Sequence, residues 1–298
     1  MRIILPYLLI LFFITSCISN ADSNGKYLFL ITIDGLRPDA VTEQTTPNLA
    51  AFLKNSSYSL NAQTVYPSNT MPSHTSLFTG LDAKNHKKTL NDHREIKKLL
   101  KQGKYLQFDT VFTIGEKNGF STTFICGKDK LKFLIRPSFQ NTVLCHDIYD
   151  KKDNIISIIT TTFSSTLKSK KNNINFIHYP EPDLSGHRHG WMTEKYLESL
   201  RIVDKEIEKL LGLIRTEWAE KEYLLIITAD HGGTEKTHGT RLKEHMTIPW
   251  IAYGSSVKKG YKIQKEVKIY DTVPTILNFL DINIPPNLDG KAVTEIFN

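Results

Sequence analysis

Beyond residue 25, hydrophobic positions fall into short runs that are separated by stretches with helical periodicity. Several runs are rich in β-branched residues, as buried strands are, and three of them lead directly into acidic side chains. The predicted strands cover residues 26–34, 120–126, 173–183, 222–232 and 248–254. These runs are the expected β framework of the chain.

Amphipathic stretches between the runs predict helices. Residues 193–221 place leucine, isoleucine and valine side chains on one stripe, as in a long helix with one buried face. Shorter helices are predicted at 46–57, where a Thr-Pro pair begins the pattern, and at 270–280 near the end of the chain. Strands that alternate with helices are typical of βαβ units, so the sequence predicts an α/β fold with a mostly parallel sheet.

The composition fits a globular protein with a large core. A chain of 298 residues with 40% hydrophobic content can bury one core in a single domain, or in a domain that carries an inserted cap. Its formal charge of +7 comes from lysines scattered in pairs, and no nucleic-acid motif accompanies them. We therefore expect a solvated basic surface that favours anionic substrates, and no nucleic-acid partner.

The N-terminal residues have the layout of a secretory signal. One arginine precedes the apolar run Ile3–Ile14, whose twelve residues fall short of the roughly 20 needed to span a bilayer. The run leads into ITSC, which resembles the bacterial lipobox; an ordinary signal peptide is the alternative. We expect residues 1–17 to be a lipoprotein signal peptide, Cys17 to carry lipid, 18–25 to be a short tether and 26–298 to form one catalytic domain. The protein would then be exported and lipid-anchored in a bacterial cell envelope.

Two further cysteines, Cys126 and Cys145, lie in the body of the chain. An oxidising compartment outside the cytoplasm would allow them to form a disulfide. Two thiols in a sequence do not establish that pairing, so it stays open at this stage.

Acidic residues and histidines follow the predicted strands. Ligands of open α/β sheets bind beyond the carboxyl ends of the strands, so these side chains are candidates for a common site. The residues concerned are Asp34, Asp183, His187, Asp230, His231 and His238. Aspartate and imidazole together suit Zn²⁺, and two such triads would make a pair of metal sites that are catalytic, because structural zinc usually relies on cysteine. For Asp34 alone, a helix cap or a turn would explain the residue equally well.

The segment 66–80, YPSNTMPSHTSLFTG, is too polar for the core and is rich in hydroxyl side chains. We expect Ser68 and Ser73 to cap a turn and a helix that begins near Met71. His74 is expected to support its neighbours rather than to bind a metal. The alternative is a polar loop without chemistry.

Five segments, taken in order, carry a resemblance to a known family. They are TIDGLRPD with TPNLAAFL, YPSNTMPSHTSLFTGL, PDLSGHRHG, TADHGG with THG, and NLDGKAV, and together they extend over nearly all of the mature chain. They resemble the alkaline phosphatase superfamily, and within it the type I phosphodiesterase/nucleotide pyrophosphatase family, with features of phosphonoacetate hydrolases and phosphate monoesterases. The resemblance implies an alkaline-phosphatase-like sandwich, with a mostly parallel central sheet and helices on both faces.

The resemblance also implies roles for the candidate residues. Thr70 would be the nucleophile, activated by a metal that lowers the pKa of its hydroxyl. Two zinc ions would be bound, one by Asp183, His187 and His238, the other by Asp34, Asp230, His231 and the oxygen of Thr70. The last histidine is open, because His245 also precedes a predicted strand. Only 238 − 231 = 7 positions separate the last two histidines of this set, so the cap should be small or absent.

Three residues match substrate-binding positions of relatives. Asn91 follows Thr70 by 91 − 70 = 21 positions, where relatives place an amide that bonds a phosphoryl oxygen; an exposed loop asparagine is the alternative. Lys128 and Lys130 resemble a Lys-Asp-Lys element that offsets an extra negative charge. They follow the predicted strand 120–126, which would bring them to the same sheet edge as the metals; otherwise they are solvated lysines.

These residues predict an exported, two-zinc phosphohydrolase that cleaves a small phosphorylated substrate, a nucleotide or another phosphoester, through an intermediate on Thr70. A phosphomonoesterase or a phosphonoacetate hydrolase using Lys128 and Lys130 is the alternative within the class. A lipoprotein that binds phosphate compounds without turnover is the alternative outside it, and a nucleophile beside complete ligand sets argues against that reading.

Overall fold

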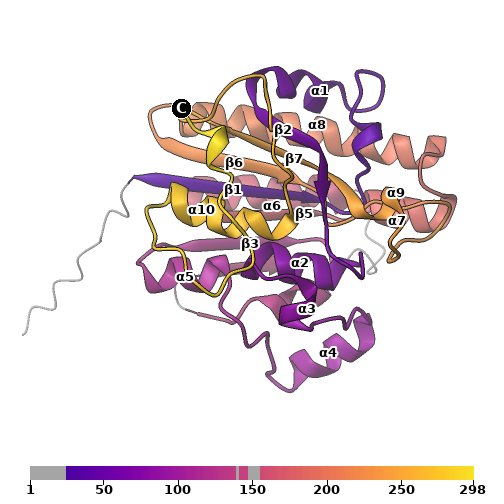
Figure 1. Cartoon of the computed structure of the whole chain (residues 1–298), viewed down its shortest axis with the longest axis horizontal. Helices are drawn as coiled ribbons and strands as arrows, with labels where there is room; N and C mark the ends of the chain where they lie inside the picture. The colour runs from indigo at the N-terminus through magenta and orange to yellow at the C-terminus, as the bar shows by residue number, and fades with distance from the viewer. Residues whose placement is uncertain (1–24, 139–140, 147–154) are drawn as a thin grey trace, which may run out of the picture.

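The computed structural model describes residues 25–138, 141–146 and 155–298. The expected signal peptide, Cys17 and all of the tether except its last residue lie outside these ranges. The described strands form one eight-stranded sheet in the order β4-β3-β5-β1-β6-β7-β2-β8 (Figure 1). They are β1 (Lys26–Ile33), β2 (Ser57–Gln63), β3 (Thr122–Cys126), β4 (Asn141–Cys145), β5 (Ile174–Tyr179), β6 (Glu222–Thr228), β7 (Thr247–Gly254) and β8 (Tyr261–Lys262).

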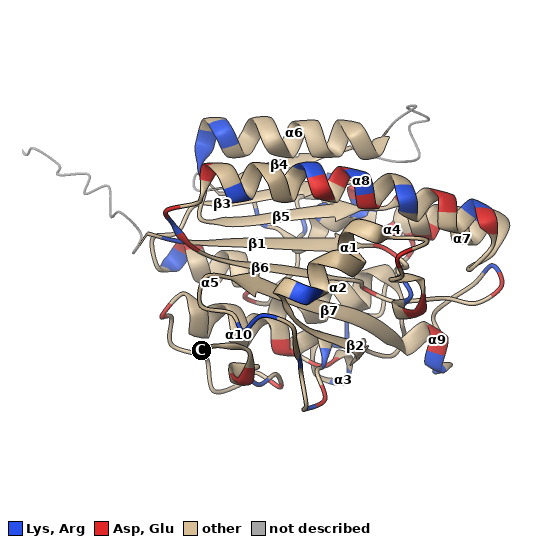
Figure 2. Ribbon diagram, turned by 90° about the horizontal axis from the view of Figure 1, so that it is seen from above, with Lys and Arg blue, Asp and Glu red and all other residues tan. Residues whose placement is uncertain are grey.

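The described helices cover both faces of this sheet. They are α1 (Pro47–Phe52), α2 (Thr70–Thr79), α3 (Ala83–His86), α4 (His93–Lys101), α5 (Val111–Lys117), α6 (Ile155–Lys170), α7 (Glu181–His189), α8 (Glu194–Glu217), α9 (Lys243–Met246) and α10 (Thr272–Phe279). Figure 2 shows α6 and α8 on one side of the strands and α5, α10 and α2 on the other. Helices α6, α7 and α1 pack against α8, whereas α10 and α5 pack against α2. The predicted sandwich is therefore confirmed.

The sheet is parallel over its larger part. Strands β4, β3, β5, β1 and β6 run parallel, and β7 runs antiparallel to both β6 and β2. The carboxyl ends of β1, β5 and β6 consequently meet at one edge, where ligands of such sheets bind. The predicted mostly parallel sheet is confirmed.

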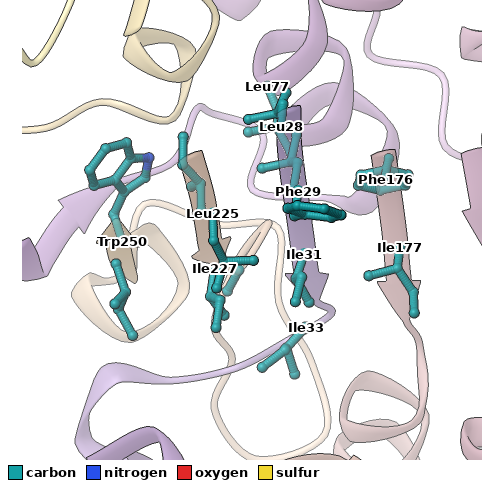
Figure 3. Packing of buried hydrophobic residues seen from close by; sticks show 14 of the residues in the cluster. Leu28, Phe29, Ile31, Ile33, Leu77, Phe176, Ile177, Leu225, Ile227 and Trp250 are labelled. Carbon is teal, nitrogen blue, oxygen red and sulfur yellow. The ribbon is translucent and has the colours of Figure 1, made fainter. Parts of the chain in front are cut away.

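The core holds these strand ends in place. Strand β1 lies in the middle of the sheet, and its residues Phe29 and Ile31 are fully buried beside Leu225 and Ile227 of β6 (Figure 3). A strand covered by helices on both faces reads as a continuous apolar run, as the sequence does here. Helix α8 buries the predicted stripe except Leu197, which is half-buried.

Several predicted boundaries were wrong. The strand expected at 222–232 ends at Thr228, and the helix expected at 193–221 ends at Glu217. The helix expected at 46–57 ends earlier: α1 stops at Phe52, a 3₁₀ turn follows, and Ser57 begins β2. The strand expected at 173–183 ends at Tyr179, and Asp183 instead lies in the first turn of α7. Pro180 and Pro182 explain why β5 ends at Tyr179 and α7 begins at Glu181, because proline lacks the N–H group that a strand needs but suits the start of a helix.

Cys126 and Cys145 form a disulfide. They are register partners at the ends of the parallel strands β3 and β4, so the bond ties the outer strand to its neighbour. Lys128 follows β3 by two positions, and the disulfide therefore lies next to the candidate site. The pairing that the sequence left open is present in the structure.

None of the helices within the described residues combines the length and the apolar character needed to cross a membrane.

Candidate active site

The candidate ligands converge beyond the carboxyl ends of β1 and β6. Asp34 directly follows β1, and Asp230 and His231 follow β6. Gly35 has φ +74°, and a Cβ atom there would lie 3.1 Å from the Cα atom of Asp183. Glycine thus lets the chain turn away from Asp34 while α7 approaches closely.

The first ligand group consists of Asp34, Asp230 and His231, all fully buried. Nε2 of His231 lies 3.5 Å from Oδ1 of Asp34 and 3.4 Å from Oδ2 of Asp230. Oδ1 of Asp230 accepts hydrogen bonds from the backbone N–H groups of Gly35 and His231, which leaves Oδ2 to face the group. Ligand atoms of these three residues lie within 4.8 Å of one another.

The second group consists of Asp183, His187 and His238. Oδ1 of Asp183 lies 3.4 Å from Nε2 of each histidine, and the two Nε2 atoms are 3.0 Å apart. Each histidine donates its Nδ1 hydrogen to a backbone carbonyl, that of Lys236 for His187 and that of Ser68 for His238. These bonds turn both Nε2 atoms toward the site, as in many metal-binding histidines. The side chain of His187 is 43% exposed, so this side of the site is open.

Several polar atoms of the two groups fit a metal better than they fit a closed protein interior. Oδ1 of Asp34, Oδ1 of Asp183, Oδ2 of Asp230 and Nε2 of His231 are buried without a hydrogen-bond partner. Such atoms are costly unless something binds them, and converging carboxylate oxygens and imidazole nitrogens are the ligands that divalent metals take. Burial, and then the charge of His231, lowers the pKa of His238 to about 3, so its ring is neutral at neutral pH and can bind a cation.

The structure brings His238, and not His245, to the ligand groups. His245 is buried below the loop that carries His238, with Nε2 bonded to Oγ1 of Thr234 at 2.9 Å and Nδ1 to Oγ1 of Thr240 at 2.8 Å. Both ring nitrogens of His245 are therefore used to hold the loop, and not to face the ligand groups. Residues 232–237 form a short turn closed by a bridge between Thr234 and Thr237, which agrees with the predicted small cap.

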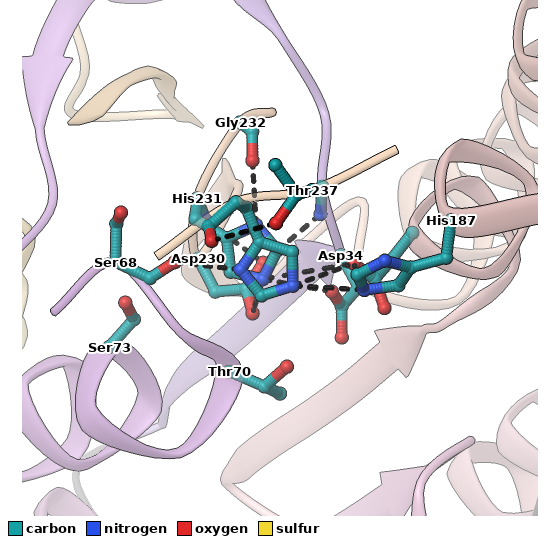
Figure 4. Close-up of polar contacts among 12 residues, drawn as sticks. Asp34, Ser68, Thr70, Ser73, His187, Asp230, His231, Gly232 and Thr237 are labelled. Atoms are coloured by element: carbon teal, nitrogen blue, oxygen red, sulfur yellow. Dashed lines mark hydrogen bonds and ion pairs between the residues drawn. The ribbon is translucent and has the colours of Figure 1, made fainter. Parts of the chain in front are cut away.

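Thr70 is the first residue of α2 and is buried beside the ligand groups (Figure 4). Its Oγ1 lies 3.5 Å from Nζ of Lys128. Its backbone carbonyl accepts a hydrogen bond from Nδ1 of His74, whose Nε2 bonds Oγ1 of Thr32. His74 lies behind Thr70 and holds the start of the helix, as expected of a supporting residue.

The expected capping roles of Ser68 and Ser73 were wrong. Asn69 occupies the N-cap position without a side-chain bond, because Pro72 has no N–H group to donate. Oγ of Ser68 donates to the carbonyl of Thr240, and Oγ of Ser73 accepts from Thr64. Another N–H group of the first turn, on Met71, donates to Oδ1 of Asn91 instead. An asparagine from a neighbouring loop thus caps the helix.

Lys128 bridges the two ligand groups, a position that the sequence did not predict. Its Nζ lies 2.7 Å from Oδ2 of Asp34 and 2.6 Å from Oδ2 of Asp183. Burial alone would raise the pKa of Asp34, but the Lys128 ammonium and a hydrogen bond from His178 hold it well below its usual range. Burial, and then the charge of Asp34, raises the pKa of Asp230 to about 7, against the opposing charges of His231 and Lys128.

His178, on β5, is a site residue that the sequence pattern did not single out. Its Nε2 bonds Oδ2 of Asp34 at 2.9 Å, and its Nδ1 accepts from the N–H group of Gly127. The signal was a lone imidazole in the otherwise mostly apolar run INFIHY, one residue before the strand ends.

Lys130 and Asn91 lie together next to α2. Nζ of Lys130 donates to Oδ1 of Asn91 at 2.9 Å. Burial, and then the charge of Lys128, lowers the pKa of the Lys130 ammonium to about 8. The structure therefore brings all three predicted substrate-binding residues to the side of the site where Thr70 lies.

Comparison with known proteins agrees with this arrangement. Residues 28–251 match the family described as type I phosphodiesterase/nucleotide pyrophosphatase. The chain belongs to this family. The family is part of the alkaline phosphatase superfamily, and the resemblance predicted from the sequence motifs is confirmed.

Curated relatives share modest identity with the chain. A bis(5′-adenosyl)-triphosphatase of Xenopus laevis is 28% identical over 75% of the chain and 51% of its own length. A 2,3-bisphosphoglycerate-independent phosphoglycerate mutase of Antithamnion sp. is 34% identical over 39% of the chain and 23% of its own length. The chain thus spans between about a quarter and a half of the length of these two relatives.

Solved structures of the superfamily share the fold. Murine ectonucleotide pyrophosphatase/phosphodiesterase 5, in an inactive form in complex with AMP, has a TM-score of 0.77 and 15% identity, and covers 92% of this chain and 100% of its own. The phosphonate monoester hydrolase of Silicibacter pomeroyi has a TM-score of 0.64 and 15% identity, and covers 90% of this chain and 75% of its own. The predicted alkaline-phosphatase-like fold is confirmed.

Proposed function

We propose that the chain is an exported, metal-dependent phosphohydrolase that cleaves phosphoesters, nucleotides among them, through a covalent intermediate on Thr70. The observation that carries the proposal is the position of the Thr70 hydroxyl, at the start of a helix and beside two groups of converging carboxylate and imidazole atoms. A protein that only binds phosphate compounds needs no nucleophile there.

The two ligand groups would hold two zinc ions. Aspartate and histidine without cysteine are typical of catalytic rather than structural zinc sites. When bound, such ions would polarise the phosphoryl group and lower the pKa of hydroxyl and water oxygens. The groups are Asp34, Asp230 and His231, joined by the oxygen of Thr70, and Asp183, His187 and His238.

Asn91 and the start of α2 would bind the phosphoryl oxygens. Oδ1 of Asn91 already accepts hydrogen bonds from Met71 and Lys130, so its amide hydrogens are the part of the side chain that a substrate would meet. The start of α2 also favours negative charge, because the positive end of the helix dipole lies there.

The reaction would be a double displacement. In the first step Oγ1 of Thr70 loses its proton to solvent and bonds to phosphorus, while the bond from phosphorus to the leaving oxygen breaks and that oxygen keeps the electron pair. In the second step water attacks phosphorus, loses a proton, and releases the Thr70 oxygen, which is protonated again. The buried ammonium of Lys128, 3.5 Å from Oγ1, would offset the charge that gathers around phosphorus.

Direct assay tests the proposal. Purified protein should release product from at least one class in a panel of phosphodiesters, phosphomonoesters and phosphonates, and a chelator should abolish that release. Absence of metal-dependent turnover across the panel, with folded and zinc-loaded protein, would favour the binding lipoprotein.

A second candidate, a phosphomonoesterase or phosphonate hydrolase, is favoured by the two buried lysines. A terminal phosphate carries more charge than a diester, and Lys130 at Asn91 is placed to offset it. We expect Lys130→Met to lower kcat/KM for a phosphomonoester at least about tenfold more than for a matched diester. Steady-state kinetics on the two substrates measures the difference.

The control for this change is Lys132→Met, because Lys132 is half-exposed and paired with Asp129 on the same turn. The pH dependence gives a second check. The ammonium of Lys130 is present below a pKa of about 8 and is lost above it, so monoester preference should fall as pH rises through 8 and should persist in Lys130→Arg. Equal losses for both substrates would show that Lys130 does not sort them by charge.

The lipid anchor on Cys17 remains part of the proposal, with a location in a bacterial cell envelope. It is supported by the ITSC motif after a short apolar run. We expect Cys17→Ala to move the protein from the membrane fraction to the soluble fraction in the native host. Unchanged partitioning of this variant would speak for a retained signal helix or a peripheral contact instead.

A further inference from the structure

One edge of the site carries an aromatic–cation pair that the proposed reaction does not use. The guanidinium of Arg241 lies over the ring of Tyr66, with 4.0 Å between Cζ and the ring centroid. Tyr66 is 47% exposed, and Arg241 is exposed as well. A large ring and a cation held together in solvent form a surface suited to an anionic ligand.

Hydrogen bonds fix the two loops that carry this pair. Nδ1 of His238 donates to the carbonyl of Ser68 at 2.9 Å, and Oγ of Ser68 donates to the carbonyl of Thr240 at 2.8 Å. The loops also touch at Gly239, where φ is +97° and a Cβ atom would lie 2.6 Å from Oδ1 of Asn69. The close approach requires glycine, and it sets one loop rigidly against the other.

The pair consequently has a defined place relative to the reacting groups. Tyr66 precedes Thr70 by four residues, and Arg241 follows His238 by three. Three residues span at most about 10 Å, so the long side chain of Arg241 stays within reach of a ligand bound at His238.

Arg241 has its donors available. No carboxylate within residues 25–138, 141–146 and 155–298 lies within ion-pair distance of it, and one face of its guanidinium is covered by Tyr66. The planar fork bonds phosphate oxygens in pairs through its edges. The stacked ring leaves those edges free and limits the rotation of the side chain.

The chemistry determines which part of a substrate reaches this edge. In an in-line displacement the leaving oxygen lies opposite the attacking oxygen, here opposite Thr70. The group of His187 and His238 lies on the open side of the site, with the His187 side chain 43% exposed. A leaving group that departs by this side passes His238 and meets the loop of Arg241.

We infer that Tyr66 and Arg241 form a leaving-group subsite that favours substrates whose leaving group carries a further phosphate. Arg241 would bind that phosphate through its N–H edges, and Tyr66 would act as a positioning residue for the guanidinium. The inference rests on the proposed function, and it adds the discrimination between phosphoanhydrides and simple esters.

Matched substrates isolate this effect. Thymidine 5′-triphosphate and the p-nitrophenyl ester of thymidine 5′-phosphate share the transferred group, as do pyrophosphate and p-nitrophenyl phosphate. At matched free metal concentration, Arg241→Ala should lower the ratio of kcat/KM, anhydride over nitrophenyl ester, by roughly 10- to 100-fold in whichever pair the protein turns over. Tyr66→Ala should lower the ratio in the same direction, and Tyr66→Phe should keep it near wild type because the ring survives.

Lys243→Ala is the control, because it removes the same charge from an exposed position two residues after Arg241; it should leave the ratio unchanged. An equal effect of Arg241→Ala on both members of a pair, or no effect, overturns the subsite. If turnover is lost in Thr70→Ala but Arg241→Ala leaves the kcat/KM ratio unchanged, only the subsite is refuted. If turnover survives in Thr70→Ala, the proposed function is refuted and the subsite with it.

Discussion

We expect a Thr70→Ala variant to fold, to keep zinc on the carboxylate and imidazole ligands of both groups, and to lose roughly three orders of magnitude or more in kcat/KM for its best phosphoester. The loss follows because water must then attack phosphorus without a covalent step. Steady-state kinetics, with circular dichroism and zinc content measured on the same preparation, checks this expectation.

Two variants of the same helix serve as controls. Thr70→Ser keeps the hydroxyl and should retain part of the activity. Thr75→Ala removes another buried hydroxyl of α2, whose Oγ1 bonds the carbonyl of Met71, and should cost stability but little turnover. A Thr70→Ala protein with near wild-type kcat/KM contradicts the covalent mechanism.

Metal removal has the second large effect. We expect close to two zinc ions per chain in the purified protein, complete loss of turnover on chelation, and recovery when zinc is added back. Asp34→Asn removes a charged ligand from the first group and should lower zinc content and abolish activity, because the remaining ligands bind a cation less tightly. Elemental analysis and activity on the same samples measure both.

The two histidines near β7 provide a matched pair for this prediction. His238→Ala should lose metal from the second group, whereas His245→Ala should keep metal, since His245 bonds Thr234 and Thr240 behind the loop. Full metal content in His238→Ala together with reduced metal content in His245→Ala would show that His245, and not His238, binds the metal.

The central strands could be predicted because each is a long apolar run. Strands β1, β5 and β6 are buried on both faces, so composition alone marks them. Strand β2, SYSLNAQ, is polar along much of its length and pairs mainly with the distant β7, so local sequence did not reveal it. The antiparallel direction of β7 likewise depends on pairing with β6, which is a property of the whole sheet.

The convergence of the acids and histidines could be predicted because each acid directly follows or closely succeeds a strand that the sequence marks. The position of Lys128 could not, since it depends on how β3 lies relative to Asp34 and Asp183, which are distant in the chain. The cap of α2 was predicted wrongly for a related reason. Pro72 has no N–H group to donate to Asn69, and Asn91, from another loop, accepts a hydrogen bond from Met71.

The stereochemical course at phosphorus tests the covalent mechanism most directly. A phosphorothioate diester that is chiral at phosphorus is hydrolysed in ¹⁸O-labelled water. Because each in-line displacement inverts phosphorus, the configuration of the product shows whether one or two displacements occurred. Two in-line displacements, the first by Thr70 and the second by water, predict retention of configuration. Inversion would show a single displacement by water and would contradict the intermediate on Thr70.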